Sequence, residues 1–347
     1  MRKFIFIFQL LLVLKVNAAS CLFDQNQLQY IGGLEKIKNQ NLWKSYPLEN
    51  RFIMAEAEGD KRGIYILNSN EVELSKSGLP HEICSNSKRV FKIGNNFQID
   101  NFIPHLYCSS IDDGGCSSIP NLSLFQKNTN LNIGIELYAP TQVKSILNKV
   151  FQDENIYSSS QIMMYNATHE DFHMYQILRG WLLNSKSKYQ WKFGFTIDEC
   201  NKNNASWTEK YNAEKKIWNE NLKNISTMNQ EKIQSLLGAI IKIRTAKDEA
   251  EEHCWDTLEN QERFEGSGHY VGNHALLIAG LAEKNELDKI DLIYLKIKPE
   301  IQSVMPVYIS GSAFLRLLHQ LDPTDNWMSD IEDGWSPYSL LRKKLNI

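Results

Sequence analysis

The absence of proline between Pro140 and Pro299 is the feature that most restricts how this chain of 347 residues can fold. Proline breaks a helix from within, and apolar residues in this stretch recur three and four positions apart, so we predict a mainly helical second half from about residue 158. The Asn-rich segment Cys200 to Asn204 is predicted to connect two helices. The predicted helices are Ser159 to Leu183, Ser206 to Met228, Gln230 to Glu259, Arg263 to Ala282, Gly311 to Gln320 and Tyr338 to Leu345.

Residues 21–155 have a different pattern, in which short apolar or alternating runs are separated by Asn, Ser, Gly and Pro. Gly63 to Leu67, Arg89 to Ile93 and Leu131 to Tyr138 are such runs, and this pattern is typical of short strands and loops. A helical spacing returns only at Thr141 to Asp153. We therefore expect an α+β fold, in which a strand-rich N-terminal region (21–155) packs on a mainly helical C-terminal region (156–347).

The first 20 residues have the layout of a secretory signal peptide, with Arg2 and Lys3 before the apolar run Phe4 to Leu14 and small residues at 18–20. The run is about half of the roughly 20 residues that span a bilayer, and no other stretch is longer, so we expect no transmembrane segment. The protein is expected to be secreted, or to lie in the periplasm or at the cell surface. A lipid anchor at Cys21 is the alternative if residues 18–21 act as a lipoprotein signal.

The cysteine count favours disulfide bonds. Removal of residues 1–20 leaves an even number of cysteines, which suits disulfides in an oxidising compartment, whereas lipidation of Cys21 would leave one thiol unpaired. None of the spacings is CxxC, which disfavours a cysteine zinc finger, and the spacing does not fix the pairing. The six are Cys21, Cys84, Cys108, Cys116, Cys200 and Cys254.

Charge and composition exclude other classes of protein. The chain has 42% hydrophobic and 23% charged residues, which is ordinary for a globular protein and excludes a disordered or fibrous one. Lys and Arg number 38 against 41 for Asp and Glu, so the net charge is −3 and no overall positive field attracts a polyanion. Nucleic acid is therefore not an expected partner.

Residues 169–173 read His-Glu-Asp-Phe-His, an HExxH motif inside a predicted helix. Residues four apart lie one turn above each other on one helix face, so His169 and His173 can offer two imidazole nitrogens to a single ion. Glu170 is rotated off that line, where it can reach a water rather than the ion and act as a general base. The alternative is a chance coincidence on a solvated helix face, so the hypothesis needs a third ligand.

The best candidate for the third ligand is Glu265, because Gly266, Ser267 and Gly268 follow it. Glycines inside a helix cost about 1 kcal/mol each relative to alanine, so two of them here indicate a close approach to another helix. Glu262, one turn earlier, is the competing ligand and could instead support a histidine.

These two segments resemble the gluzincin group of secreted zinc metallopeptidases. Residues 168–173 are similar to its (T)HExxH helix, and residues 265–270, EGSGHY, resemble its EGxAxY-type element that carries the glutamate ligand. The resemblance extends over about residues 160–345. It implies one zinc ion bound by His169, His173 and Glu265, with Glu170 as the base. The 92 residues that separate His173 from Glu265 are more than in the thermolysin-like and aminopeptidase branches, so no subfamily is assigned.

The activity expected from this resemblance is hydrolysis of amide bonds in a peptide or protein. The donor to the developing oxyanion does not transfer by motif, and Tyr308, Tyr270 and His269 are the candidates for it. Leu131 to Tyr138 is the candidate strand edge for pairing with an extended substrate.

Two other functions compete with the hydrolase. One is a metal-binding or surface-interaction protein, in which a further ligand such as His269 completes a structural zinc site. The other is a serine hydrolase using Ser267 or Ser312, but neither lies in a GxSxG motif.

Overall fold

The computed structural model describes residues 25–37, 40, 42–44, 46, 158–189, 197–294 and 305–347, and six strands between residues 52 and 137 for the backbone alone. The predicted signal peptide, Cys21, Cys84, Cys108, Cys116 and the predicted helix Thr141 to Asp153 lie outside the described residues. None of the described helices is both long and apolar enough to cross a membrane.

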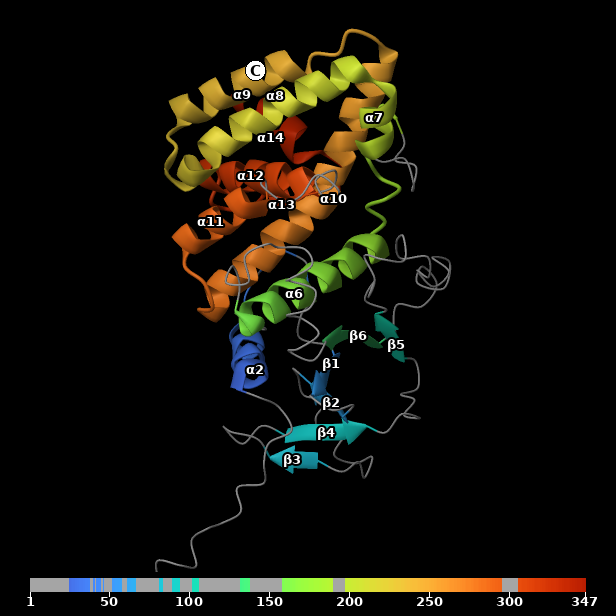
Figure 1. The fold of residues 1–347 in the computed structure, drawn as a ribbon, viewed down its shortest axis with the longest axis vertical. Coiled ribbons are helices and arrows are strands. Elements are labelled where there is room, and N and C mark those ends of the chain that lie inside the picture. Colours follow the sequence, from blue (N-terminus) through green and yellow to red (C-terminus); the bar gives the residue numbers. More distant parts are fainter. Residues whose placement is uncertain are drawn as a thin grey trace, which may run out of the picture.

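The second half of the chain is helical, as predicted (Figure 1). The first predicted helix is α6, which begins at Ser159 but ends at Leu178, before Gly180 with its positive φ of 74°. The helices of this half of the chain are α6 (Ser159–Leu178), α7 (Ile197–Asn203), α8 (Ala205–Asn221), the 3-10 helix η4 (Leu222–Thr227), α9 (Gln230–Arg244), α10 (Glu249–Ala279), α11 (Lys284–Tyr294), α12 (Met305–Leu321), α13 (Trp327–Glu332) and α14 (Pro337–Leu345).

Helix α10, at 31 residues, runs through the middle of this helical body. It begins at the cap Asp248, whose side chain accepts a hydrogen bond from the backbone of Glu251, and ends at Gly280 in the left-handed conformation. The sequence predicts that one helix ends at Glu259 and the next begins at Arg263. This boundary is wrong, because the Asp248 cap starts α10 earlier and the helix continues through these residues. Buried residues occur on all sides of α10, which packs against α6 and α12.

The N-terminal region begins with helix α2 (Gln25–Ile37), which no predicted element anticipated. Tyr30, Leu34 and Ile37 are fully buried and belong to the same core as the second half of the chain. Lys36 adds a hydrogen bond from its ammonium to the carbonyl of Ala279 at the end of α10 (2.9 Å). Spacings of four and three bring these apolar side chains to one face, which explains how α2 docks against α6 and α10.

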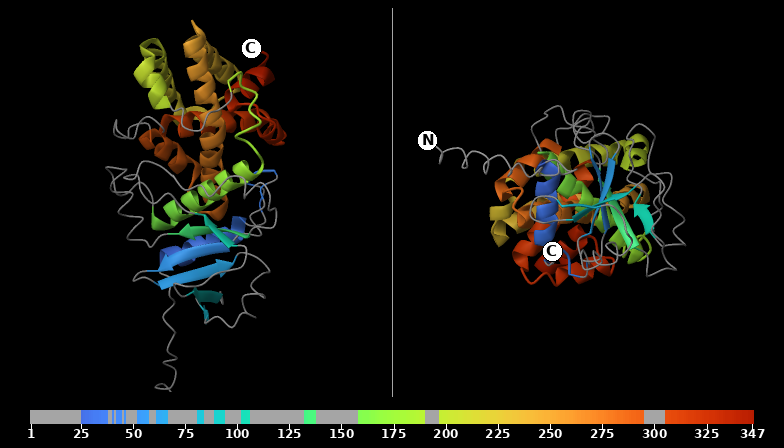
Figure 2. Two further views of the ribbon diagram at one scale, coloured as in Figure 1. Left: turned by 90° about the vertical axis from the view of Figure 1, so that its right-hand side faces the viewer. Right: turned by 90° about the horizontal axis from the view of Figure 1, so that it is seen from below.

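The sheet is made of short strands of three to six residues, in the order β3-β4-β2-β1-β6-β5. β6 runs parallel to both β1 and β5, whereas the other pairs are antiparallel. Figures 1 and 2 show the sheet on the side of α6 away from the other C-terminal helices. The strands are β1 (Phe52–Ala57), β2 (Lys61–Ile66), β3 (His81–Ile83), β4 (Arg89–Ile93), β5 (Phe102–His105) and β6 (Asn132–Leu137).

Two expectations about this region need correction. The α+β class with a strand-rich N-terminal part is wrong: where side chains are described, 78% of the residues are helical and none lies in a strand. The physical reason is that the described residues between Gln25 and Tyr46 supply a helix and core side chains to the helical body, which the pattern of short apolar runs in residues 21–155 does not indicate. Within Leu131 to Tyr138, Asn132–Leu137 forms β6, which has a neighbouring strand on each side and so does not offer a free edge.

One predicted disulfide is present in the described residues. Cys200 of α7 and Cys254 of α10 are bonded, with their Cα atoms 5.7 Å apart. The bond is surrounded by the buried side chains of Ile197, Trp207 and Trp255, in a small core beside the main one. The expected connector at Cys200 to Asn204 is wrong, because residues 200–203 belong to α7, and the bond ties this helix to α10.

Candidate metal centre

Helix α6 holds the HExxH motif in a fixed orientation. A capping box starts the helix, in which Ser158 and Gln161 exchange hydrogen bonds between side chain and backbone. Phe172, on another face from the histidines, is fully buried and packs against the rings of Trp43 and Tyr46, with centroids 5.2 and 5.3 Å away. These contacts fix the rotation of α6 about its axis.

The two histidines and Glu265 converge on one point between α6 and α10. Nε2 of His173 lies 2.9 Å from Nε2 of His169 and 3.0 Å from Oε2 of Glu265. The third separation, from Nε2 of His169 to the same oxygen, is 3.8 Å. Within the described residues these three side chains form a group that could hold a metal ion. His169 is 3% exposed and His173 9%, so the group lies in the interior.

Small residues allow the two helices to approach. A Cβ built on Gly268 would lie 3.0 Å from three ring atoms of His169 and His173, so any side chain there would press on the imidazoles. Gly266 faces another helix, because its Cβ would lie 2.5 Å from Cα of Gly311 in α12. The expected close approach to α6 is therefore made by Gly268, whereas Gly266 serves the packing of α10 on α12.

His173 is oriented by groups around it. Its Nδ1 hydrogen bonds to Oε1 of Gln176 (2.7 Å), and Nε2 of Gln176 donates to the carbonyl of Phe264 (2.9 Å). The ring of Phe264 stacks on the imidazole with a centroid distance of 4.5 Å and an interplanar angle of 5°. Because the amide oxygen of Gln176 accepts, Nδ1 carries a hydrogen, which leaves Nε2 as the nitrogen that would bind an ion.

His169 is held between two tyrosine rings. Tyr308 and Tyr165 each stack on it with centroids 5.4 Å away. A hydrogen bond with the backbone of Gly268 adds to this, and the hydroxyl of Tyr165 lies 3.5 Å from Nδ1. Tyr308 also hydrogen bonds to the carboxylate of Glu265, so it contacts two of the three candidate ligands.

His269 lies behind the group rather than in it. Its Nδ1 is 2.5 Å from the hydroxyl of Tyr165, and its Nε2 is 2.8 Å from Oδ1 of Asp291. His269 is fully buried and both ring nitrogens are engaged, so the expected role as an oxyanion donor or fourth ligand is not supported. Asp291, His269 and Tyr165 form instead a row of hydrogen bonds that ends beside His169.

Glu262 is not placed at the metal group. Its two carboxylate oxygens accept hydrogen bonds from the guanidinium of Arg244 at 2.6 and 2.9 Å, and Ser310 donates a third at 2.6 Å. Arg244 also donates two hydrogen bonds to Glu214, at 2.6 and 2.8 Å, and all three charged side chains are buried. Glu262 therefore neither competes as the third ligand nor supports a histidine. It belongs to a buried ion-pair network with Arg244 and Glu214.

Of the two tyrosines predicted as oxyanion donors, one lies at the metal group and the other does not. Tyr308 is at the group, as its contacts with His169 and Glu265 show. Tyr270 is placed elsewhere, with its ring against those of Trp43 and Trp327. Sequence reasoning missed Gln176, which lies one turn of α6 after His173, on the same face. That spacing is the signal that would have identified it.

Glu265 favours a positive charge on His173, whereas burial disfavours the charged forms of His169 and Glu170. Burial acts to lower the pKa of His173, but the charge and hydrogen bond of Glu265 outweigh it and raise the pKa to about 9. Burial lowers the pKa of His169 well below its usual value, assisted by the charge of His173. Burial also raises the pKa of Glu170 to about 7. Its Oε1 lies 4.0 Å from Nε2 of His169, and its side chain is 31% exposed.

No protein-family model matches this chain, and neither the curated proteins nor the solved structures gave a significant match. The function is therefore argued from the geometry and chemistry of the site.

Proposed function

We propose that this protein is a secreted, zinc-dependent hydrolase that cleaves amide bonds in peptides or proteins, in the manner of a gluzincin. The observation that carries the proposal is the convergence of two imidazole nitrogens and one carboxylate oxygen, with a second glutamate beside them. Nitrogen and oxygen donors in this number are those of catalytic zinc sites, which keep one position open for water.

The arrangement of the donor atoms suits zinc. Ligand atoms around a tetrahedral zinc ion with bonds of about 2.0 to 2.2 Å lie about 3.4 Å apart, and the separations here of 2.9, 3.0 and 3.8 Å bracket that value. Oε2 of Glu265 is buried and lies 3.0 Å from Nε2 of His173 and 3.8 Å from Nε2 of His169. A buried carboxylate needs a positively charged partner, and a cation shared with the two imidazoles would supply it.

The remaining residues have roles that follow from their positions. A bound zinc ion would polarise the scissile carbonyl and lower the pKa of a water molecule. Glu170, whose Oε1 lies 4.0 Å from Nε2 of His169, would take a proton from that water and later pass it to the leaving amine. Tyr308, stacked on His169 and hydrogen bonded to Glu265, would orient both ligands and is the candidate donor to the oxyanion.

A structural zinc site is the weaker alternative. It would need a fourth protein ligand, and the candidate for that position was His269. Because His269 is engaged with Tyr165 and Asp291, no fourth His, Cys, Asp or Glu joins the group within the described part of the chain. An open fourth position favours catalysis.

The test combines metal content with turnover. We expect one zinc per purified chain by elemental analysis, and loss of that zinc in His169→Ala. Glu170→Gln is expected to keep zinc but lose peptide cleavage by about 100-fold or more, because the general base is removed. Glu231→Gln, on the exposed face of α9, is the matched control and should leave both unchanged. Absence of bound metal in protein prepared without chelators, or full cleavage by Glu170→Gln, would refute the proposal.

A further inference from the structure

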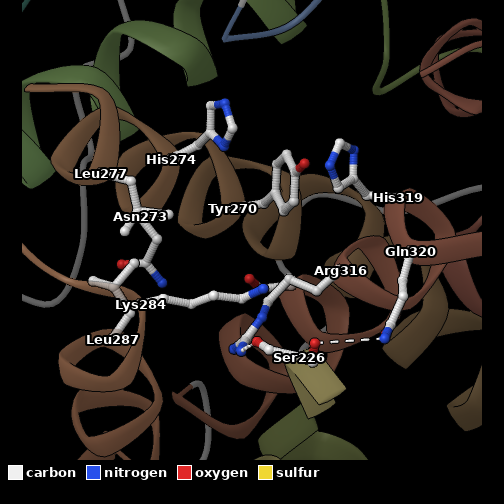
Figure 3. A pocket seen from close by; sticks show the side chains of 11 residues that line it. Ser226, Tyr270, Asn273, His274, Leu277, Lys284, Leu287, Arg316, His319 and Gln320 are labelled. Atoms are coloured by element: carbon white, nitrogen blue, oxygen red, sulfur yellow. Dashed lines mark hydrogen bonds between the residues drawn. The ribbon is translucent and has the colours of Figure 1, made fainter. Parts of the chain in front are cut away.

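Apart from the metal group, a pocket lies between α10, α11, α12 and η4, and its lining includes none of the residues of that group (Figure 3). Its volume is about 240 Å³. Pockets for drug-sized molecules measure roughly 300 to 1,000 Å³, so this one suits a smaller ligand. The proposed hydrolysis makes no use of it.

The charged groups in the lining are basic. Among the described residues, Lys284, Arg316, His274 and His319 line the pocket and no carboxylate does. Arg316 is paired outside the lining, with Asp291 at 2.9 Å and with Asp288, and His319 is paired with Asp325. Lys284 forms no salt bridge within the described residues, although its charge acts on the nearby Asp288, and Figure 3 shows its side chain extending across the pocket towards Arg316. The ammonium of Lys284 therefore has no direct carboxylate partner and can bind an anionic group.

Two buried polar side chains in the lining lack partners. The hydroxyl of Ser312, which is fully buried, makes no hydrogen bond within the described residues. The same is true of Oδ1 of Asn273, a residue only 5% exposed, whose Nδ2 lies against His269 (3.1 Å). Buried polar atoms are normally satisfied, so each indicates a missing hydrogen-bond partner. Ser312 can donate to a ligand oxygen, whereas Oδ1 of Asn273 can only accept from a ligand donor.

The rest of the wall is apolar. Leu277 of α10, Leu287 of α11 and the ring of Tyr270 line the pocket. A ligand that fits all of these features carries one anionic group, one hydrogen-bond donor and a compact apolar body.

We propose that this pocket binds a free α-amino acid with an apolar side chain. The carboxylate lies at Lys284 and the Ser312 hydroxyl, the ammonium donates to Oδ1 of Asn273, and the side chain packs against Leu277 and Leu287. The site shares no lining residue with the metal group and the proposal does not rest on the activity proposed there, although Asn273 and Arg316 contact His269 and Asp291 of the row beside that group.

Isothermal titration of the full-length protein with L-leucine tests the proposal. We expect L-leucine to bind the native chain, and Lys284→Gln and Ser312→Ala each to weaken binding about tenfold, which is the loss expected for a hydrogen bond to a charged group. Lys289→Gln, also exposed on α11 but outside the lining, is the matched control and should bind normally. L-Leucinol, which lacks the carboxylate, and 4-methylpentanoate, which lacks the ammonium, should each bind more weakly than L-leucine.

A further variant separates this pocket from the metal group, because amino acids also chelate zinc. Binding should persist in His173→Ala, which disrupts the metal group alone. Absence of any heat with native protein, equal affinity of Lys284→Gln and native protein, or loss of binding in His173→Ala would each overturn the proposal.

Discussion

At the scale of single residues, the metal group depends on side chains that carry no charge. Gln176 fixes the hydrogen on His173, and Tyr165 and Tyr308 hold the ring of His169 between them. Gly268 provides the space in which the two imidazoles meet. The chemistry of the HExxH motif is thus set by neighbours that the motif itself does not specify.

Replacement of Gly268 by alanine should weaken metal binding. The new Cβ would lie 3.0 Å from ring atoms of both histidines, so the rings must move, and overpacking of this kind costs about 1 to 3 kcal/mol. Competition with a chelator would measure the zinc affinity. Gly238→Ala in α9 is the control, because its Cβ would meet nothing within 4 Å, and it should raise stability by up to about 1 kcal/mol. Unchanged zinc affinity in Gly268→Ala would contradict the proposed site.

Replacement of His269 by alanine should lower zinc affinity by about 10- to 100-fold, as is usual for groups that orient a ligand. The row from Asp291 through His269 to Tyr165 would lose its central member, and Tyr165 would no longer be held beside His169. His253→Ala, on the same helix but outside this row, serves for comparison. If the two variants bind zinc equally, His269 has only a structural role.

At the scale of elements, one buried arginine joins four helices. Arg244 of α9 binds Glu214 of α8 and Glu262 of α10, and Glu262 in turn accepts a hydrogen bond from Ser310 of α12. The network lies one turn of α10 before Glu265. It therefore fixes the position of the helix that supplies the carboxylate of the metal group.

Loss of the Arg244 charge should be strongly destabilising. Arg244→Met would leave the buried carboxylates of Glu214 and Glu262 without a cationic partner, for which we expect a loss of about 3 to 5 kcal/mol in the free energy of unfolding, measured with urea. Lys242→Met, two residues earlier and exposed, should change that free energy by less than about 0.5 kcal/mol. A small effect of Arg244→Met would mean that the carboxylates bind protons instead.

At the scale of the whole molecule, the two segments of the candidate site were found from sequence because periodicity and small residues are local signals. The pair His169 and His173 follows from helical spacing, and Glu265 from the glycines beside it. The role of Glu262 could not be predicted, because its partner Arg244 is brought to it only by the packing of α9 on the core. Helix α2 was missed because Gly32 and Gly33 weaken its helical pattern, whereas burial against α6 and α10 stabilises it.

The Cys200–Cys254 bond should contribute to the stability of the whole chain. It closes a loop of 54 residues, so the chain-entropy relation gives about 4 kcal/mol of stabilisation. We expect the double variant with alanine at both positions to show a loss of this order in urea unfolding under oxidising conditions. Reduction of the native protein should give a similar loss, and no change in either experiment would contradict the relation.

The division of the candidate metal ligands between α6 and α10 would couple two equilibria. An ion held by both helices binds only when they are docked, so its binding free energy adds to the cohesion of the folded chain by mass action. At a free ion concentration 100 times the dissociation constant, this linkage adds about 2.7 kcal/mol to the free energy of unfolding. A protein of this design would resist unfolding most where the ion is abundant, and chelation would loosen the contact between these two helices first.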